Sequence, residues 1–200
     1  MKRIGIFGGS FNPPHRGHMH LAESVRAALA LDEVWLIPSK ISPHRSMDAY
    51  APEADRLAMC RLAAEAYPWL HVSDYELQSE RVSYTWYTVE HFAKTHPDDE
   101  LWLLMGSDML LSFSSWYRWQ DILRLANVAG IARAPGEDER LNEAAAQLSR
   151  FGEIRVIHVD SFEVSSTKIR EMVRKGSLDP CYLSEKIVQY IEERHLYAGK

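Results

Sequence analysis

Six short apolar runs recur along the chain, and most of them are separated by segments with the 3.6-residue period of a helix. The runs lie at residues 4–7, 34–37, 70–72, 101–105, 128–132 and 154–159. Runs that are apolar on both faces, such as LWLLM at 101–105, are typical of parallel strands buried between two layers of helices. The alternation predicts an α/β fold that is doubly wound, with a mostly parallel sheet and helices on both faces.

The length of 200 residues suits one hydrophobic core, so we expect a single domain over residues 1–200. Two helical patterns follow the last apolar run, at 167–175 and 183–195, with Gly176, Asp179 and Pro180 between them. They predict a small C-terminal helical subregion over residues 166–200. The stretch APGEDER, at 134–140, is predicted to be a surface loop.

The charge balance limits the classes of partner. Lys and Arg number 23 against 28 Asp and Glu, a net charge of -5, so the chain has no general basic field for nucleic acid or an anionic membrane. Any anion site must be local. The two cysteines, and the absence of an apolar stretch near the roughly 18 residues that span a membrane, predict a cytoplasmic protein.

The stretch GGSFNPPHRGH, at 8–18, joins the first run to an amphipathic helix. Ligands of open α/β sheets bind at this kind of position, where a loop meets a helix N-terminus. Neither G-x-G-x-x-G nor G-x-x-x-x-G-K-[ST] is present, but His15 and His18 flank Gly17 and lie beside the helix start. We expect them to help hold an anion. Alternatively, the pair caps the helix or simply packs.

The stretch VSSTKIREMV, at 164–173, has an unusual helix start. Ser165, Ser166 and Thr167 are good N-cap residues, yet Lys168 and Arg170 stand in the first turn, where the helix dipole favours acids. A docked anion would explain the cations, whereas an exposed first turn that is unfavourable by about 0.3–1 kcal/mol would need no ligand. Two such helix starts in one chain favour a polyphosphate site.

These two stretches also carry a resemblance. GGSFNPPHRGH resembles the H-x-G-H signature of the nucleotidyltransferase superfamily, and VSSTKIR resembles its S-S-T-x-I-R helix start. Between them, successive motifs resemble those of the bacterial nicotinate-nucleotide adenylyltransferase family, and together they cover nearly the whole chain. These motifs are SPHR (42–45), SYT (83–85), GSD (106–108), SSWYRW (114–119) and RAPG (133–136).

The resemblance implies a Rossmann-like nucleotidyltransferase fold and transfer of AMP from ATP to nicotinate mononucleotide. The products would be nicotinate adenine dinucleotide and pyrophosphate, in a step of NAD biosynthesis. Mg2+ is expected as the cofactor, held through the ATP phosphates and not by a protein-only metal site. Because a mononucleotide phosphate is already ionised, direct in-line attack on the α-phosphate requires no activated Ser or Cys.

The resemblance also implies residue roles. The implied catalytic residues are His15, His18 and Arg170. The implied ATP-binding residues are Gly8, Gly9, Ser10, Phe11, His15, His18, Gly106, Asp108, Ser165, Ser166, Thr167 and Arg170. The implied residues for nicotinate mononucleotide are Asn12, His44, Arg45, Tyr84, Thr85, Trp116, Tyr117 and Arg133. Many family members have Lys at the position of Arg45, which changes the reach and geometry of the cation.

Within the acceptor set, Thr85 and the Tyr117 amide would bind the pyridine carboxylate, and Trp116 would stack on the ring. Trp119, spaced with Ile122 and Leu123, is expected in the core.

Other interpretations remain open from the sequence. The nearest is an adenylyltransferase acting on nicotinamide mononucleotide or phosphopantetheine. A non-catalytic nucleotide-binding protein and a metal-binding protein using His15, His18 and His20 are two more. The expected partners are the small molecules ATP and nicotinate mononucleotide, with a homodimer left open.

Overall fold

A computed structural model describes residues 1–40, 50–134, 136–160 and 162–198 of the chain. Its strands are β1 (Arg3–Gly9), β2 (Glu33–Pro38), β3 (Leu70–Val72), β4 (Glu100–Gly106), β5 (Asn127–Ala132) and β6 (Ile154–His158). They form one sheet in the order β3-β2-β1-β4-β5-β6, and every neighbouring pair is parallel. The predicted doubly wound α/β fold is confirmed, and each predicted run corresponds to one strand.

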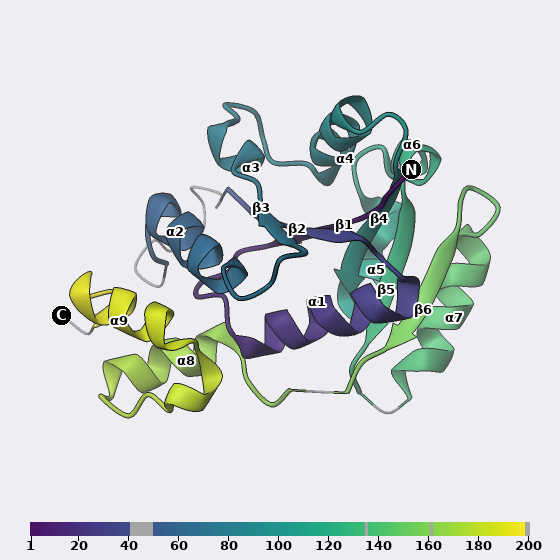
Figure 1. Cartoon of the computed structure of the whole chain (residues 1–200). Coiled ribbons are helices and arrows are strands. Elements are labelled where there is room, and N and C mark those ends of the chain that lie inside the picture. Colours follow the sequence, from purple (N-terminus) through teal and green to yellow (C-terminus); the bar gives the residue numbers. More distant parts are fainter. Residues whose placement is uncertain (41–49, 135, 161, 199–200) are drawn as a thin grey trace.

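Helices cover both faces of this sheet, with α1, α8 and α9 on one side and α4 and α6 on the other (Figure 1). The helices are α1 (Arg16–Leu29), α2 (Glu53–Ala64), α3 (Tyr75–Gln78), α4 (Thr85–Thr95), α5 (Ser107–Ser112), α6 (Trp119–Leu125), α7 (Glu137–Leu148), α8 (Ser166–Arg174) and α9 (Glu185–Glu193). Within the described ranges, no helix combines the length and apolarity needed to cross a membrane.

Two hydrophobic clusters hold the layers together. Val25 and Leu29 of α1 and Ile169 of α8 belong to the cluster on one face, whereas Val89 and Phe92 of α4 belong to the cluster on the other. Successive residues of a strand point to opposite faces, so a strand buried on both sides must be apolar at every position. This is why LWLLM, in β4, lacks polar alternation.

The strand order reverses at β1, which lies between β2 and β4. The chain winds outward from β1 through β2 and β3, then returns to start again at β4. The segments that leave β1 and β4 therefore diverge and leave a crevice at the carboxyl ends of these strands. Residues 8–18 run from the end of β1 into α1, and residues 106–108 run from the end of β4 into α5, so both segments lie at this crevice.

The prediction of a surface loop at 134–140 is wrong for its second half, because α7 begins at Glu137. Gly136 precedes the helix with a left-handed φ of 81°, and Glu137, Asp138 and Glu139 occupy the first turn. Three carboxylates near a helix N-terminus interact favourably with the helix dipole. Polarity had suggested a loop, but the same acidic residues stabilise a helix start.

Gly152, between α7 and β6, packs closely against α6, and this contact can be tested by mutation. A Cβ atom there would lie 2.5 Å from the backbone oxygen of Leu123 in α6. Backbone cannot move aside as a flexible side chain can, so we expect Gly152→Ala to lower the free energy of unfolding by about 1–3 kcal/mol. Urea unfolding would measure this. Gln147→Ala, at an exposed position of α7, serves as the control, and equal stability of both variants would contradict the close contact between Gly152 and α6.

Candidate active site

Hydrogen bonds join the loop after β1 to the first turns of α8, more than 150 residues away along the chain. Ser166 Oγ donates to the carbonyl oxygen of Pro13 at 2.9 Å, and Arg170 Nη1 donates to that of Asn12 at 2.9 Å. Ser165 caps α8, since its Oγ accepts from the backbone N–H of Lys168 at 3.2 Å. The two stretches singled out from the sequence, 8–18 and 164–173, therefore lie side by side.

His15 and His18 lie against each other with ring centroids 3.7 Å apart. The backbone N–H of His15 donates to Nδ1 of His18 at 3.2 Å, so His18 both caps α1 and belongs to the site. An imidazole that accepts at Nδ1 carries its proton on Nε2. Burial, together with nearby His15 and Arg133, holds the pKa of His18 well below its ordinary value. His18 is thus a neutral imidazole that can donate from Nε2.

A pocket of about 210 Å³ opens beside these histidines. His15, His18, Ser165, Ser166 and Arg133 line it. The pocket joins hydroxyl, imidazole and guanidinium groups at two helix N-termini, the surroundings that favour a phosphate. We refer to it as the phosphate pocket. Arg133 had been assigned to the acceptor side by resemblance, but it lines this pocket with His18.

Residues 8–11 form the end of β1 and the start of the loop that leads to His15. A Cβ atom on Gly8 would meet nothing within 4 Å, so the chain is open there, whereas one on Gly9 would lie 3.0 Å from the Phe11 ring. Phe11 itself is buried, and its backbone is left-handed with φ 44°. The open side of the loop at Gly8 is where a ligand could approach the backbone closely.

Two residues outside the motifs described above, Arg56 and Tyr197, support this loop from the side of the protein interior. Arg56 is fully buried and donates to the carbonyl oxygens of Ser10 at 2.7 Å and Ser39 at 2.8 Å. Tyr197 donates to Oδ1 of Asn12 at 2.7 Å. The sequence holds a signal for Arg56, because it shares the buried stripe of α2 with Met59 and Cys60. Tyr197 has no such signal.

Asn12 was expected to contact the acceptor. The structure places it in the interior, where its Oδ1 also accepts the backbone N–H of Ala51 at 3.0 Å. Asp108 is exposed in the first turn of α5, two residues after Gly106. The Thr167 hydroxyl accepts from Arg170 Nη2 at 3.2 Å. The predicted contacts His44 and Arg45 lie outside the described residues.

A second pocket, of about 300 Å³, brings together the segments 83–85 and 115–117. We call it the acceptor pocket. Its lining includes Tyr84, Thr85, Trp116 and Tyr117, and the Tyr84 and Tyr117 rings lie 4.8 Å apart. Thr85 is the first residue of α4, so backbone N–H groups of that helix end are near. Aromatic walls beside a helix N-terminus suit a flat ring that carries an acid group.

The two tryptophans of SSWYRW separate as expected. Trp116 lines the acceptor pocket, while Trp119 packs edge-on against Phe151 with centroids 4.8 Å apart and joins the second core cluster.

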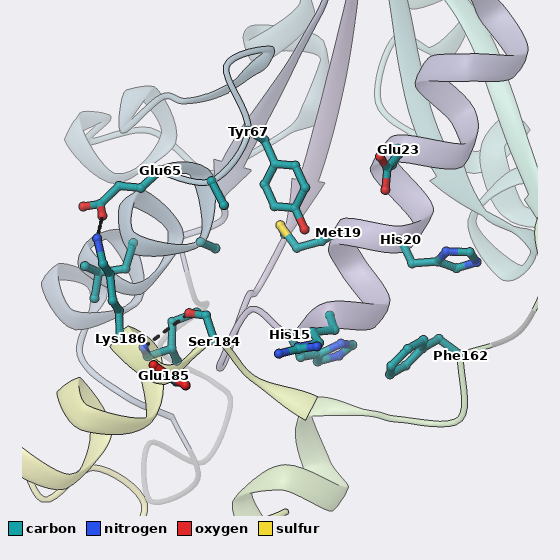
Figure 2. Close-up of a pocket in the computed structure, with 15 residues that line it drawn as sticks. His15, Met19, His20, Glu23, Glu65, Tyr67, Phe162, Ser184, Glu185 and Lys186 are labelled. Atoms are coloured by element: carbon teal, nitrogen blue, oxygen red, sulfur yellow. Dashed lines mark hydrogen bonds and ion pairs between the residues drawn. The ribbon is translucent and has the colours of Figure 1, made fainter. Parts of the chain in front are cut away.

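A larger pocket, of about 680 Å³, lies between α1, the end of α2 and the start of α9 (Figure 2). It adjoins the phosphate pocket through His15, His20 and Phe162. Lys186 is ion-paired with Glu65 at its edge, and Glu23 also lines it (Figure 2). This mixed charge suits a polyphosphate less well than the phosphate pocket does.

Metal ligands are not assembled by the protein in the ranges that the structure covers. Among these residues, no group of three or more His, Cys, Asp or Glu side chains could hold a metal ion. The alternative of a metal site built on His15, His18 and His20 therefore has no additional ligand there.

Comparison with known proteins agrees with this geometry. The cytidylyltransferase-like family model matches residues 6–172. The nicotinate-nucleotide adenylyltransferase of Bacillus subtilis is 34% identical over 197 residues, covering 98% of this chain and 99% of the relative. A probable nicotinate-nucleotide adenylyltransferase of Geobacillus thermodenitrificans is 34% identical over 200 residues, covering 100% and 88%.

Solved structures share the fold. Nicotinic acid mononucleotide adenylyltransferase of Plasmodium falciparum complexed with NaAD aligns with a TM-score of 0.77 at 19% identity, over 98% of both chains. The same enzyme complexed with APC aligns with a TM-score of 0.76.

Burial of His15 predicts a pH-dependent stability. Burial lowers the pKa of His15 to about 4, whereas an unfolded histidine titrates near 6.5. The unfolded chain therefore binds the proton first, so stability from this group is complete above about pH 6.5 and is lost as pH falls toward 4. Urea unfolding of His15→Gln at several pH values should show a weaker decline over this window than the parent. An unchanged slope would contradict the buried, neutral state of His15.

Proposed function

The chain belongs to the cytidylyltransferase-like family and to the nicotinate-nucleotide adenylyltransferases, and we propose that it transfers the adenylyl group of ATP to nicotinate mononucleotide. The products are nicotinate adenine dinucleotide and pyrophosphate, in a step of NAD biosynthesis. The observation that carries the function is the meeting of residues 8–18 with the start of α8 at the crevice of the sheet. It creates a phosphate pocket on a fold known for nucleotide binding.

The reaction is one in-line displacement. A phosphate oxygen of the acceptor forms a bond to the α-phosphorus of ATP, and the bond from that phosphorus to the bridging oxygen breaks. The electron pair leaves with pyrophosphate. Since the nucleophile is already an anion at neutral pH, the protein must position the two substrates and stabilise charge. This agrees with a site whose histidines are neutral donors.

His18 is the residue we assign to the α-phosphate. Its Nδ1 is held by the His15 backbone, which aims the ring and fixes the proton on Nε2. A neutral donor of this kind stabilises charge that grows on the phosphate oxygens in the transition state.

We assign the β- and γ-phosphates to His15, Arg170 and the start of α8 at Ser165 and Ser166. Arg170 is held in place by Asn12 and Thr167, and the helix start adds unsatisfied backbone N–H groups. Preorganised cations and dipoles of this type bind phosphate chains without rearrangement.

We propose that Mg2+ is held through the ATP phosphates, because the described side chains do not form a metal site of their own. Bound there, it would neutralise charge on the phosphate chain. Asp108, exposed after β4, is the carboxylate we assign to the ribose or to water on the ion.

The acceptor pocket supports a pyridine ring that carries a carboxylate. Trp116 provides an aromatic face, and Thr85 lies at the N-terminus of α4 with hydroxyl and backbone donors. Donors alone satisfy both oxygens of a carboxylate, but they leave the NH2 of an amide facing another donor. This distinguishes nicotinate from nicotinamide mononucleotide, and phosphopantetheine offers no ring to stack.

Removal of the His18 imidazole tests the catalytic assignment. We expect His18→Ala to lower kcat about 100-fold or more with a smaller change in the KM values, since its contact strengthens in the transition state. Pyrophosphate release with Mg-ATP and nicotinate mononucleotide would measure this, alongside a thermal melt to verify folding. A folded variant with the kcat of the parent would show that His18 does not stabilise the transition state.

The preference between nicotinate and nicotinamide mononucleotide tests the assignment of the acceptor pocket. We expect kcat/KM for nicotinate mononucleotide to exceed that for nicotinamide mononucleotide by about 100-fold or more at saturating Mg-ATP. Thr85→Val should narrow the ratio, whereas Thr95→Val at the other end of α4 should leave it unchanged. Equal use of both acceptors by the parent would defeat the nicotinate assignment and leave an adenylyltransferase of broader choice.

A further inference from the structure

One carboxylate ties together the chain segments that follow β4 and β5. Oε2 of Glu137 accepts the backbone N–H of Arg133 at 2.8 Å and that of Ala134 at 3.0 Å. Oε1 accepts from the hydroxyl of Ser107 at 3.0 Å. Glu137 belongs to α7, so a further element joins the start of α5 to the segment after β5, which the sheet brings together only through the pairing of β4 with β5.

Both segments contribute to the candidate active site. Ser107 is buried between Gly106 and Asp108, which we place on the ATP side. Arg133 lines the phosphate pocket together with His18, and its charge helps to lower the pKa of His18. A Cβ atom on Gly106 would lie 3.4 Å from Nη2 of Arg133, so the guanidinium extends along the end of β4.

Arg133 is exposed and follows the last residue of β5. Within the part of the chain that the structure describes, its guanidinium forms no ion pair or side-chain hydrogen bond. A long exposed side chain samples many rotamers, and fixing it in one of them costs conformational entropy. A fixed backbone at 133–134 limits where this guanidinium can reach, and that restriction comes from Glu137.

Glu137 differs from the two acids that follow it. Asp138 and Glu139 also lie in the first turn of α7, where any acid gains from the helix dipole. Glu139 is exposed. Only Glu137 of these three receives hydrogen bonds from residues 107, 133 and 134 among the described contacts, and those bonds lower the pKa of its carboxyl.

We propose that Glu137 is a positioning residue for ATP, which fixes Arg133 and the 106–108 segment in the geometry that receives the nucleotide. The inference rests on the proposed function for the identity of the ligand. It predicts that loss of Glu137 weakens the binding of ATP but not that of the acceptor. The acceptor pocket is formed by residues 83–85 and 115–117, and Glu137 makes no hydrogen bond to them among the described contacts.

The test compares three variants of the full chain. Glu137→Ala removes all three bonds, and Glu137→Gln keeps one oxygen acceptor. Glu139→Gln removes the same charge from the same helical turn without removing any of these bonds. Titration calorimetry with Mg-ATP alone gives the Kd for ATP without turnover. Initial rates of pyrophosphate release give the KM for nicotinate mononucleotide.

We expect Glu137→Ala to raise the Kd for ATP about tenfold while the KM for the acceptor stays within about twofold. Glu137→Gln should be intermediate, and Glu139→Gln should match the parent. If Glu137→Ala does not fold, the Kd values for ATP of Glu137→Gln and Glu139→Gln are compared instead, and the inference requires the higher value for Glu137→Gln.

Two results would overturn the inference: equal Kd values for the Glu137 and Glu139 variants, or equal losses for ATP and acceptor. Failure of the proposed function is a separate outcome, because it would show as a parent protein that binds Mg-ATP but forms no nicotinate adenine dinucleotide.

Discussion

The contact between the loop after β1 and the start of α8 is the interaction on which the site depends. Ser166 and Arg170 reach the carbonyl oxygens of Pro13 and Asn12, and so close the crevice that the reversal of strand order opens. Each bond is worth about 0.5–3 kcal/mol, but their consequence is geometric. They set a second helix N-terminus beside the histidines, which turns an open sheet edge into a pocket for several phosphate groups.

Positive character at this pocket arises locally in a chain whose net charge is -5. The histidines contribute as neutral donors, because burial keeps their pKa values below the ordinary range. Charge comes from guanidinium groups: Arg133 lines the pocket, Arg170 is bonded to the loop after β1, and Arg56 is buried behind that loop. Arginine stays ionised when buried, so it is suited to a site that must remain cationic while the imidazoles remain neutral.

Supporting contacts recur behind each part of the site. Arg56 and Tyr197 hold the loop after β1, whereas Glu137 holds the start of α5 and the segment after β5. Each support comes from a part of the chain outside the segment it fixes. Such preorganisation lets a site whose chemistry needs no activated nucleophile act through position and electrostatics alone.

The sequence by itself determined the sheet and the outline of the site. Apolar periodicity placed all the strands, and local cap chemistry placed Ser165, because both depend only on neighbours along the chain. Tertiary structure alone decided which distant groups come together. Arg133 lines the same pocket as His18, the Asn12 side chain is buried and bonded to Tyr197, and Glu137 connects Ser107 to the segment after β5. Those outcomes depend on strand order and on packing between elements far apart in sequence, and no local pattern encodes such contacts.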